Sequence, residues 1–523
     1  MNVPLTPLDF MRRARALYGS RSAVVDGGRR WTYEEFATRA DRWSAALQRL
    51  GVRAGDRVAY IAANTHAQLE SFYAVPQMGA VLVPINYRLA PEEFVYLLNH
   101  SGARVLCAAE PHTEQVDSMR AELQNVEHYV ALEGARPGWM DYEAALAGSA
   151  PEFIRPAIGE DDLLTINYTS GTTSRPKGVM ITHRNAWVNA VGTLVHVHMT
   201  PADRYLWTLP MFHANGCTFT WIVTAAGGTH VCLRRPDPAQ VFDLIGREGV
   251  TMLCAAPTVL ISLANAPAAQ RTHVPSGVRV ITAGAPPAAA TIDAIENGLG
   301  WTVTHVYGLT ETAPFITICE PRPEHAALSP EERCVIKARQ GVELITSGEL
   351  RVITEDGRDV PRDGFTLGEI VVRGNVVMKG YYADPDATRA CMGDGWFRSG
   401  DAAVVHPDGY VEIRDRLKDV IISGGENISS VEVEAMLLRH PAVQEAGVVG
   451  LPDSRWGEAP HAFVVVKAGA TVTADDLRAF SRAHLAHFKT PHSFSFVTVL
   501  PKTATGKIQK YVLRSGRANL AAQ

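Results

Sequence analysis

Hydrophobic and polar positions alternate between helix-like and strand-like patterns over the first hundred residues. Apolar side chains recur at helical spacing over 36–50. Thr32 and Glu35, just before this run, form a capping-box pair in which each side chain can bond the other's free backbone N–H, so they predict a helix start. Short apolar runs at 57–62 and 80–85 predict strands, with a helical pattern between them. This β-α-β order predicts a mainly parallel sheet covered by helices.

The pattern changes in the second half of the chain. Between 347 and 405, runs that alternate apolar and polar residues are separated by Gly, Asp and Pro, which predicts antiparallel strands joined by turns. Helical and strand patterns mix again after Arg416, and this last segment has the size of a separate small domain. The chain is therefore expected to divide into a large N-terminal and a small C-terminal part.

Composition and charge reduce the range of functions. The 523 residues are 46% hydrophobic and 20% charged, as in globular proteins, and 50 basic against 55 acidic residues give a net charge of −5. This balance lacks the basic excess of proteins that bind nucleic acid or anionic membranes. Seven scattered cysteines without a C-x-x-C pair argue against a disulfide framework or a zinc site and favour a reducing compartment.

No targeting or membrane signal is apparent in the sequence. The first residues lack the charged and then apolar segments of a secretory signal, and no apolar run approaches the ~20 residues that a membrane helix needs. We therefore expect a cytoplasmic enzyme that acts on small molecules, with no membrane span and no nucleic-acid partner.

The segment 168–178 carries the first chemical signal. It follows an apolar strand at 163–166 and concentrates small, hydroxyl-bearing and basic residues, namely Thr169, Ser170, Gly171, Thr172, Thr173 and Lys177. Glycines let backbone N–H groups turn toward an anion, hydroxyls donate to phosphate oxygens and a lysine adds charge. No Gly-Lys-Ser/Thr ends the segment, so it is not a Walker A motif. It predicts a phosphate loop, and taken alone it would leave a Ser/Thr/Gly-rich surface loop as the alternative.

Five further motifs follow this loop in order along the chain. They are Tyr307-Gly-Leu-Thr-Glu311, Gly368-Glu-Ile-Val-Val-Arg-Gly374 with Gly380-Tyr-Tyr382, Gly395-Trp-Phe-Arg-Ser-Gly-Asp401, Asp415-Arg-Leu-Lys-Asp419 with Gly424-Gly-Glu-Asn427, and Pro501-Lys-Thr-Ala-Thr-Gly-Lys507. With the loop, they resemble the adenylate-forming superfamily, which includes acyl-CoA synthetases, peptide-synthetase adenylation domains and luciferases. Pro210-Met-Phe-His-Ala-Asn-Gly216 resembles its medium-chain, branched-chain and aryl acyl-CoA synthetase branch.

The resemblance implies an α/β fold with two domains. Residues 1–414 would form a large N-terminal domain of mainly parallel sheets covered by helices, plus a small β-barrel-like subdomain. Residues 415–523 would form a small, mobile α+β C-terminal domain that rotates about a hinge at Asp415 and Arg416. The ATP and acyl sites would lie in the large domain, and the catalytic lysine in the small one.

The resemblance also implies a site for ATP and AMP. Its residues would be Thr169, Ser170, Gly171, Thr172, Thr173, Lys177, Gly284, Ala285, Tyr307, Gly308, Thr310, Glu311, Asp401 and Arg416. Tyr307 would stack on adenine, and Asp401 suits the ribose hydroxyls because an ionised carboxylate only accepts hydrogen bonds. Glu311 is the candidate Mg²⁺ ligand. Without the motifs, Tyr307 would be read as core packing and Asp401 as a turn residue.

Lys507 and His213 are the catalytic candidates. Attack of a carboxylate on the α-phosphate builds negative charge on phosphoryl oxygens, and a lysine ammonium stabilises that state more than the ground state. By contrast, Lys502 and Lys510 are expected to be solvated. Many acyl-CoA synthetases place a histidine at the His213 position beside the acyl carboxylate, and a buried structural histidine is the alternative here.

The remaining assignments concern the acyl group and CoA. The implied acyl pocket consists of Phe212, Cys217, Trp221, Ala283, Ala313 and Pro314, and the implied CoA-binding residues are Gly424, Gly425 and Glu426. No Arg or Lys stands in the pocket segments to pair a second carboxylate, so a hydrophobic monocarboxylic acid is expected. Three departures from the family pattern are Ser174 in the phosphate loop, Arg398-Ser399 in place of His-Thr, and Cys217 in the pocket.

The implied enzyme is an AMP-forming acid–thiol ligase of fatty-acid or secondary metabolism. It would use ATP and Mg²⁺ to form an acyl-adenylate and pyrophosphate, and would then transfer the acyl group to CoA. Two alternatives stay open: an acyl-AMP ligase that passes the adenylate to a partner protein, and a non-catalytic nucleotide-binding protein of the same fold. The sequence also leaves open which acid is used and whether the chain forms a homodimer.

Overall fold

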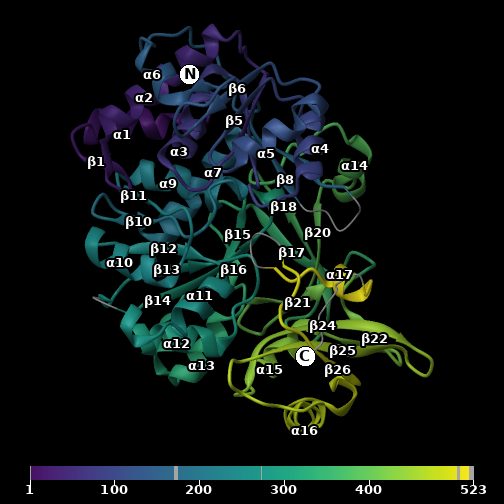
Figure 1. The fold of residues 1–523 in the computed structure, drawn as a ribbon. Coiled ribbons are helices and arrows are strands. Elements are labelled where there is room, and N and C mark those ends of the chain that lie inside the picture. The colour runs from purple at the N-terminus through teal and green to yellow at the C-terminus, as the bar shows by residue number, and fades with distance from the viewer. Residues whose placement is uncertain (1, 170–174, 272–273, 503–506, 517–523) are drawn as a thin grey trace.

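The computed structural model describes residues 2–169, 175–271, 274–502 and 507–516. It has the predicted α/β architecture, with a large body that holds two mainly parallel sheets and a smaller C-terminal body beside it (Figure 1). In the part described, no helix is long and apolar enough to cross a membrane.

An eight-stranded sheet carries the strand that leads into the phosphate loop. Its order is β19 (Gly380–Tyr381), β9 (Lys177–Thr182), β8 (Leu163–Thr169), β4 (Val81–Ile85), β3 (Arg57–Ile61), β5 (Val105–Ala108), β6 (His128–Ala131) and β7 (Met140–Asp141). The predicted strands β3 and β4 pair in parallel, with Arg57 opposite Val81. The strands from β8 to β7 are parallel, whereas β9 and β19 run antiparallel at one edge.

A nine-stranded sheet forms the second layer. Its order is β16 (Val342–Glu343), β15 (Phe315–Ile318), β14 (Thr302–Gly308), β13 (Arg279–Thr282), β12 (Met252–Ala255), β10 (Arg204–Leu206), β11 (Thr229–Cys232), β1 (Ser22–Asp26) and β2 (Arg29–Thr32). The strands from β14 to β1 are parallel, and antiparallel strands close both edges.

Helices cover these sheets, as the β-α-β order of the first hundred residues predicts. The larger ones are α1 (Leu8–Tyr18), α2 (Tyr33–Arg49), α3 (His66–Ala74), α4 (Pro91–Ser101), α5 (His112–Met119), α6 (Tyr142–Ala147), α7 (His183–Val197), α9 (Phe219–Ala226), α10 (Pro238–Glu248), α11 (Pro257–Ala264), α12 (Ala289–Leu299), α13 (Pro330–Lys337) and α14 (Pro385–Met392). The predicted capping box of Thr32 and Glu35 begins α2. One buried apolar cluster, which includes Trp43, Phe72 and Trp221, joins helices and both sheets into a common core.

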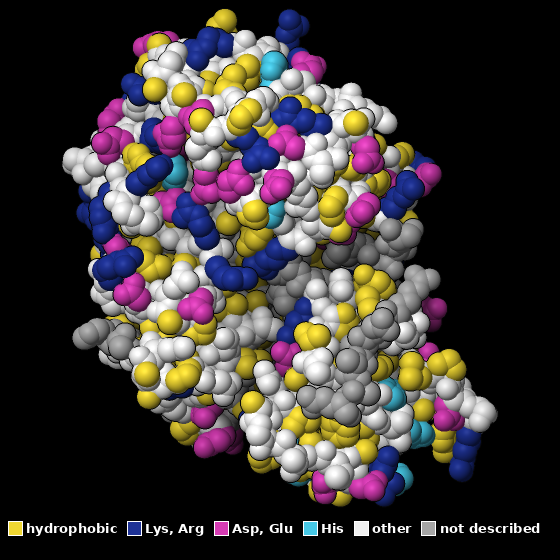
Figure 2. Space-filling model, in the orientation of Figure 1, with side chains coloured by type: hydrophobic (Ala, Val, Ile, Leu, Met, Phe, Trp, Pro, Cys, Tyr) yellow, Lys and Arg dark blue, Asp and Glu magenta, His cyan; other side chains and the backbone are white. Residues whose placement is uncertain are grey.

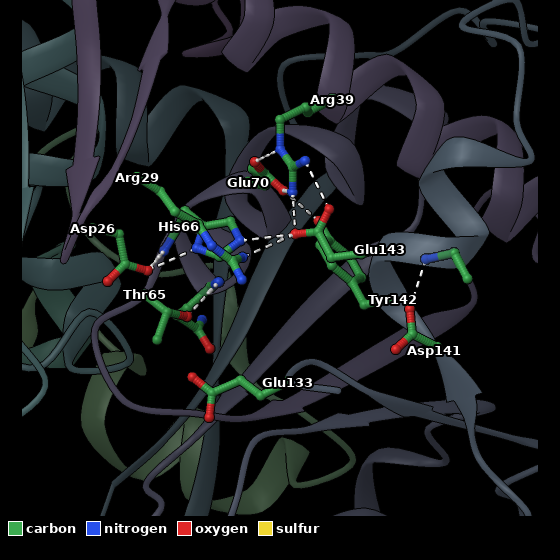
Figure 3. Close-up of polar contacts among 12 residues, drawn as sticks. Asp26, Arg29, Arg39, Thr65, His66, Glu70, Glu133, Asp141, Tyr142 and Glu143 are labelled. Carbon is green, nitrogen blue, oxygen red and sulfur yellow. Dashed lines mark hydrogen bonds and ion pairs between the residues drawn. The ribbon is translucent and has the colours of Figure 1, made fainter. Parts of the chain in front are cut away.

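A largely buried group of charged residues links strand β1 to helices α2, α3 and α6 (Figure 3). His66 at the start of α3 contacts Asp26 of β1 through Nδ1 at 2.7 Å and Glu143 of α6 through Nε2 at 3.1 Å. Arg39 of α2 donates to both Glu143, at 2.8 Å, and Glu70 of α3, at 2.5 Å. Each charge therefore meets an opposite charge, which offsets part of the cost of burying it, and removal of one partner would leave the other unpaired.

The antiparallel unit between the two bodies is a four-stranded sheet. Its path runs from β17 (Glu349–Ile353) through β18 (Gly368–Arg373) and β20 (Phe397–Val405) to β21 (Val411–Arg416). This sheet takes the place of the expected barrel-like subdomain. The predicted hinge lies at the end of β21, where Asp415 and Arg416 still pair with β20.

The C-terminal body has its own sheet and its own apolar core. The sheet consists of β23 (Glu426–Ile428), β22 (Ile421–Ser423), β25 (Gly457–Val466) and β24 (Val443–Asp453), with β26 (Ser493–Phe496) beside β25. Helices α15 (Ser430–Leu437) and α16 (Ala474–His484) pack on it, and α17 (Lys510–Arg514) contacts β24. The predicted domain boundary at 414/415 falls within β21, two residues before that strand ends, and stays a prediction.

Candidate active site

A cavity of about 450 Å³ lies where the large body meets the C-terminal body. Its wall includes residues of the phosphate-loop strands, the acyl segment, the turn after β14 and the segment that follows the hinge: Thr169, Lys177, Phe212, His213, Cys217, Ala283, Gly284, Gly308, Thr310, Glu311, Pro314, Arg416 and Lys507. In Figure 2, Lys and Arg side chains lie along the boundary between the two bodies. The structure therefore brings together predicted residues that are far apart in the sequence.

The phosphate side of the cavity is built on a strand pair. β8 ends at Thr169 and β9 begins at Lys177, and these two residues are partners in the antiparallel ladder. The turn between them includes Ser170, Gly171, Thr172 and Thr173, which lie outside the described residues, as does Ser174. The paired strand ends hold Thr169 and Lys177 together at the cavity wall.

Lys507 enters the cavity from the C-terminal body. Desolvation by the surrounding protein and the positive charge of Arg416 lower the pKa of Lys507 to about 8, even though the residue is exposed to solvent. The ammonium form therefore still predominates at neutral pH. A lysine with this charge and position can face an anionic phosphoryl group.

His213 lies on the same wall and is neutral at physiological pH. Burial, and then the positive charge of Lys507, lower the pKa of His213 to about 4. A neutral imidazole can donate one N–H to a carboxylate without forming an ion pair. An ion pair with a charged imidazolium would make the carboxylate a weaker nucleophile.

Glu311 and Thr310 lie in a short helical turn, Thr310–Thr312, directly after β14. The Tyr381 hydroxyl donates to Glu311 Oε1 at 2.9 Å. Carboxylate and hydroxyl oxygens are hard donors that suit Mg²⁺. No cluster of three or more His, Cys, Asp or Glu side chains in the described residues could hold a metal ion. The assignment of Glu311 as a Mg²⁺ ligand stays a prediction.

Asp401 is buried beside Arg416, one of the residues that line the cavity. It accepts a hydrogen bond from the Tyr307 hydroxyl at 2.5 Å and pairs with Arg416 Nε at 2.8 Å. Asp401 and Arg416 are also direct partners across β20 and β21, which explains why the sequence spacing brings them together. Tyr307, Ala285 and Asp401 are not among the described residues that line the cavity, so their contacts with a nucleotide stay predictions.

The acyl segment after His213 adopts an unusual backbone conformation. Five successive residues, 214–218, have φ between +37° and +65°. Few residues other than glycine and asparagine adopt this region of backbone conformation. A Cβ on Gly216 would lie 2.5 Å from the Trp207 ring, so only glycine fits there. This left-handed turn places Phe212 and Cys217 on the cavity wall.

Two predicted acyl-pocket residues lie elsewhere. Trp221 is buried in the core, edge-on to Tyr73 with ring centroids 5.3 Å apart. Ala313 is buried next to Pro314, and neither Trp221 nor Ala313 is among the described residues of the cavity wall. Phe212, Cys217, Ala283 and Pro314 thus form the part of the predicted pocket that lines the cavity.

The hinge and the predicted CoA residues occupy separate places. Asp415 is buried and accepts a hydrogen bond from the backbone N–H of Ser430 at 2.8 Å. Gly424 and Gly425 have φ of +60° and +90° in the hairpin between β22 and β23, and Glu426 beside them is exposed. These three residues do not line the cavity among those described, so their role with CoA stays a prediction.

The expectation that Lys502 and Lys510 are solvated is wrong. Lys510 Nζ is buried 3.0 Å from Glu434 Oε1 and 3.8 Å from Asp415 Oδ1, and Lys502 Nζ lies 2.6 Å from Glu445 Oε1. The carboxylates that partner these lysines belong to α15, β24 and the hinge, which are remote in sequence. Lys510 therefore fastens the segment that carries Lys507 to the hinge region.

Sequence reasoning also missed a buried amide beneath the acyl segment. Asn167 of β8 donates to the backbone oxygen of Phe212 at 3.2 Å, and its Oδ1 accepts from Thr165 at 2.7 Å. Asn215 in turn donates to Thr165 Oγ1 at 3.2 Å. A polar residue inside the apolar strand at 163–169 was the available signal. These bonds tie the phosphate-loop strand to the acyl segment.

Comparisons with known proteins agree with this geometry. The family model described as AMP-binding enzyme matches residues 11–382, and the model described as AMP-binding enzyme C-terminal domain matches 432–507. The 4-hydroxybutyrate–CoA ligase 2 of Metallosphaera sedula is 43% identical over 520 residues, which cover 98% of this chain and 94% of that protein. An acetate/butyrate–CoA ligase of Arabidopsis thaliana, named peroxisomal, is 42% identical over 537 residues, with coverage of 98% and 94%.

A solved structure is similar over the same length. The anthranilate CoA ligase AuaEII in complex with anthranoyl-AMP aligns with a TM-score of 0.88 and 25% identity, and the alignment covers 98% of each chain. The predicted fold class and superfamily are thereby confirmed. The chain belongs to the family of AMP-binding enzymes, the adenylate-forming superfamily, in its CoA-ligase branch.

Proposed function

We propose that this chain is an AMP-forming acid–thiol ligase that activates a hydrophobic monocarboxylic acid with ATP and transfers the acyl group to CoA. One observation carries the proposal: Lys507 of the C-terminal body lines the same cavity as Lys177, Glu311 and His213 of the large body. Neither body holds all of these groups alone, so adenylation requires both.

The first step joins the acid to AMP. A carboxylate oxygen of the acid attacks the α-phosphorus of ATP, and the bond from that phosphorus to the pyrophosphate oxygen breaks. The ammonium of Lys507 stabilises the negative charge that develops on the α-phosphoryl oxygens, and Lys177 neutralises the phosphates that leave. His213 orients the carboxylate by donating an N–H. Mg²⁺, held by Glu311, would neutralise triphosphate charge when bound.

The second step transfers the acyl group to the thiol. The CoA thiol loses its proton to solvent, and the thiolate sulfur attacks the carbonyl carbon of the acyl-adenylate. The bond from that carbon to the AMP oxygen then breaks, which releases AMP. We assign Lys507 to the first step alone, because in the second step the bond breaks at the carbonyl carbon and the AMP phosphate leaves as a stable dianion. We assign Gly424, Gly425 and Glu426 to the thiol path after a rotation at Asp415.

The cavity wall supports a hydrophobic, uncharged acyl chain. Phe212, Cys217, Ala283 and Pro314 surround the region next to His213, and none of these side chains would pair with a second carboxylate. Burying an unpaired charge there would be costly. Relatives named for 4-hydroxybutyrate, acetate or butyrate, and anthranilate indicate that small aliphatic and aryl acids should head the test panel.

Pyrophosphate exchange with such a panel tests the proposal. Acid-dependent incorporation of labelled pyrophosphate into ATP, followed by CoA-dependent release of AMP and an acyl-CoA thioester, is the expected result. Adenylate that accumulates without any thioester would favour the acyl-AMP ligase. Absence of exchange with every acid would favour the non-catalytic alternative.

Compartment and assembly are part of the same proposal. All seven cysteines are free, and six are buried, which agrees with a reducing compartment, and we propose the cytoplasm. Fluorescence microscopy of the tagged chain tests this, and a peroxisomal pattern would contradict it. The homodimer stays open until light scattering on the purified chain gives its mass.

A further inference from the structure

Tyr381 belongs to a motif to which the two reaction steps assign no role. It lies in 380–382 and ends β19, which pairs antiparallel with β9, the strand that begins at Lys177. In the same segment, the backbone N–H of Met378 donates to the backbone oxygen of Glu311 at 2.8 Å. Tyr381 is therefore fixed between the strand that carries Lys177 and the turn that carries Glu311.

The Tyr381 side chain contacts both of these charged residues. Its hydroxyl donates to Glu311 Oε1 at 2.9 Å, while Lys177 Nζ lies 4.8 Å from the centre of its ring. A phenol donates a hydrogen bond at neutral pH, and its ring face attracts a cation within about 6 Å of its centroid. One side chain thus holds a carboxylate by its edge and an ammonium by its face.

This arrangement keeps two opposite charges from pairing with each other. Within the described chain, Lys177 and Glu311 form no mutual ion pair, and both contact Tyr381 instead. A direct ion pair would satisfy both groups internally and would have to open before either could meet a ligand. A spacer between them pre-organises the two charges for binding, which lowers the cost of association.

We propose that Tyr381 is a positioning residue for the nucleotide. Its hydroxyl directs Glu311 toward the metal ion, and its ring holds Lys177 apart for a phosphate oxygen. This inference rests on the proposed function, in which Glu311 and Lys177 face the metal and the phosphates of ATP. Tyr381 itself touches neither reacting atom.

Two variants separate the two contacts. Tyr381→Phe removes the hydroxyl and keeps the ring, whereas Tyr381→Leu removes both. Tyr382→Phe is the matched control, since the ring of Tyr382 packs edge-on to His100 with centroids 5.8 Å apart, whereas the contacts with Glu311 and Lys177 are made by Tyr381. ATP binding is measured by calorimetry on the full chain, once with Mg²⁺ and once with EDTA, and AMP binding confirms that each variant is folded.

The two variants should respond differently to Mg²⁺. A hydrogen bond to a charged group is worth about tenfold to hundredfold in binding, so Tyr381→Phe should raise the Kd for ATP by about tenfold or more with Mg²⁺. With EDTA, its Kd should stay within about twofold of wild type. Tyr381→Leu should weaken ATP binding under both conditions, and the KM for the acid should change in neither variant.

Other outcomes overturn the inference. Wild-type binding by Tyr381→Phe with Mg²⁺, or equal weakening with Mg²⁺ and with EDTA, would show that the hydroxyl does not direct Glu311. If Tyr381→Leu fails to fold, Tyr381→Phe decides alone. Failure of the proposed function is distinct, because wild-type protein would then show no acid-dependent pyrophosphate exchange.

Discussion

The buried histidine between the two sheets gives a stability prediction that depends on pH. His66 contacts Asp26 and Glu143 and stacks on Trp31 with ring centroids 4.4 Å apart. Burial would lower the pKa of His66, but the hydrogen bonds to Asp26 and Glu143 outweigh it and raise the pKa from 6.5 to about 9. The imidazolium is therefore part of the native charge network at neutral pH.

The size of this contribution follows from the shift. At about 1.4 kcal/mol per pKa unit, a rise from 6.5 to about 9 amounts to about 3 kcal/mol of added stability for the folded state. Because the folded-state pKa is raised, this stabilisation is complete below the unfolded pKa near 6.5 and is lost as pH rises through about 9. His66→Gln removes the titrating group while keeping a polar side chain.

Urea unfolding of wild type and His66→Gln between pH 6 and pH 10, at constant ionic strength, measures the effect. The wild type should be more stable by about 3 kcal/mol at pH 6, and the difference should shrink steadily toward pH 10. His487→Gln, at an exposed histidine of the C-terminal body, is the control and should follow the wild type. A difference that stays constant over this range would refute the reasoning, since it would reflect packing instead of charge.

Three further predictions concern the cavity. Gly216→Ala brings a Cβ against the Trp207 ring at a φ of +59°, so the KM for the acid should rise about tenfold, a cost of the size expected for overpacking, while calorimetric ATP affinity stays unchanged. The ammonium of Lys507 is the active form and its pKa is about 8, so pyrophosphate exchange should decline as pH rises through 8. Lys507→Arg should abolish that decline, however fast or slow the variant is, because the guanidinium stays charged over this range. Asp401→Asn leaves Arg416 without its carboxylate and should weaken AMP binding by about tenfold in calorimetry; unchanged affinity would remove Asp401 from the ribose site.

The sequence predicts those parts of the fold that depend on local patterns. The capping box of Thr32 and Glu35 begins α2 as expected, and the apolar runs near 57 and 81 become the parallel strands β3 and β4. Helical periodicity and capping depend on residues a few positions apart, so both can be recognised in a single sequence. The motif order, in turn, predicts that Lys507 shares a site with Lys177, and the cavity agrees.

Contacts that depend on tertiary packing were beyond sequence reasoning. Lys510 pairs with Glu434 and lies near Asp415, and no local pattern links these three residues. The left-handed turn at 214–218 holds Ala, Cys and Thr, which do not favour positive φ, beside Asn and Gly, which accept it, so the surrounding core must impose the conformation on the other three. The contacts of Tyr381 with Glu311 and Lys177 become apparent only from the pairing of β19 with β9, which the sequence does not indicate.

Lys507→Ala, assayed in both half-reactions, tests the central claim most directly. Pyrophosphate exchange measures adenylation, and thioester formation from synthetic acyl-adenylate and CoA measures the second step, with Lys502→Ala as the control. The account predicts that exchange falls by about a hundredfold or more, because a charge aimed at the developing oxyanion is lost, while thioester formation stays within about twofold of wild type. Equal loss of both half-reactions, or exchange at the wild-type rate, would contradict it.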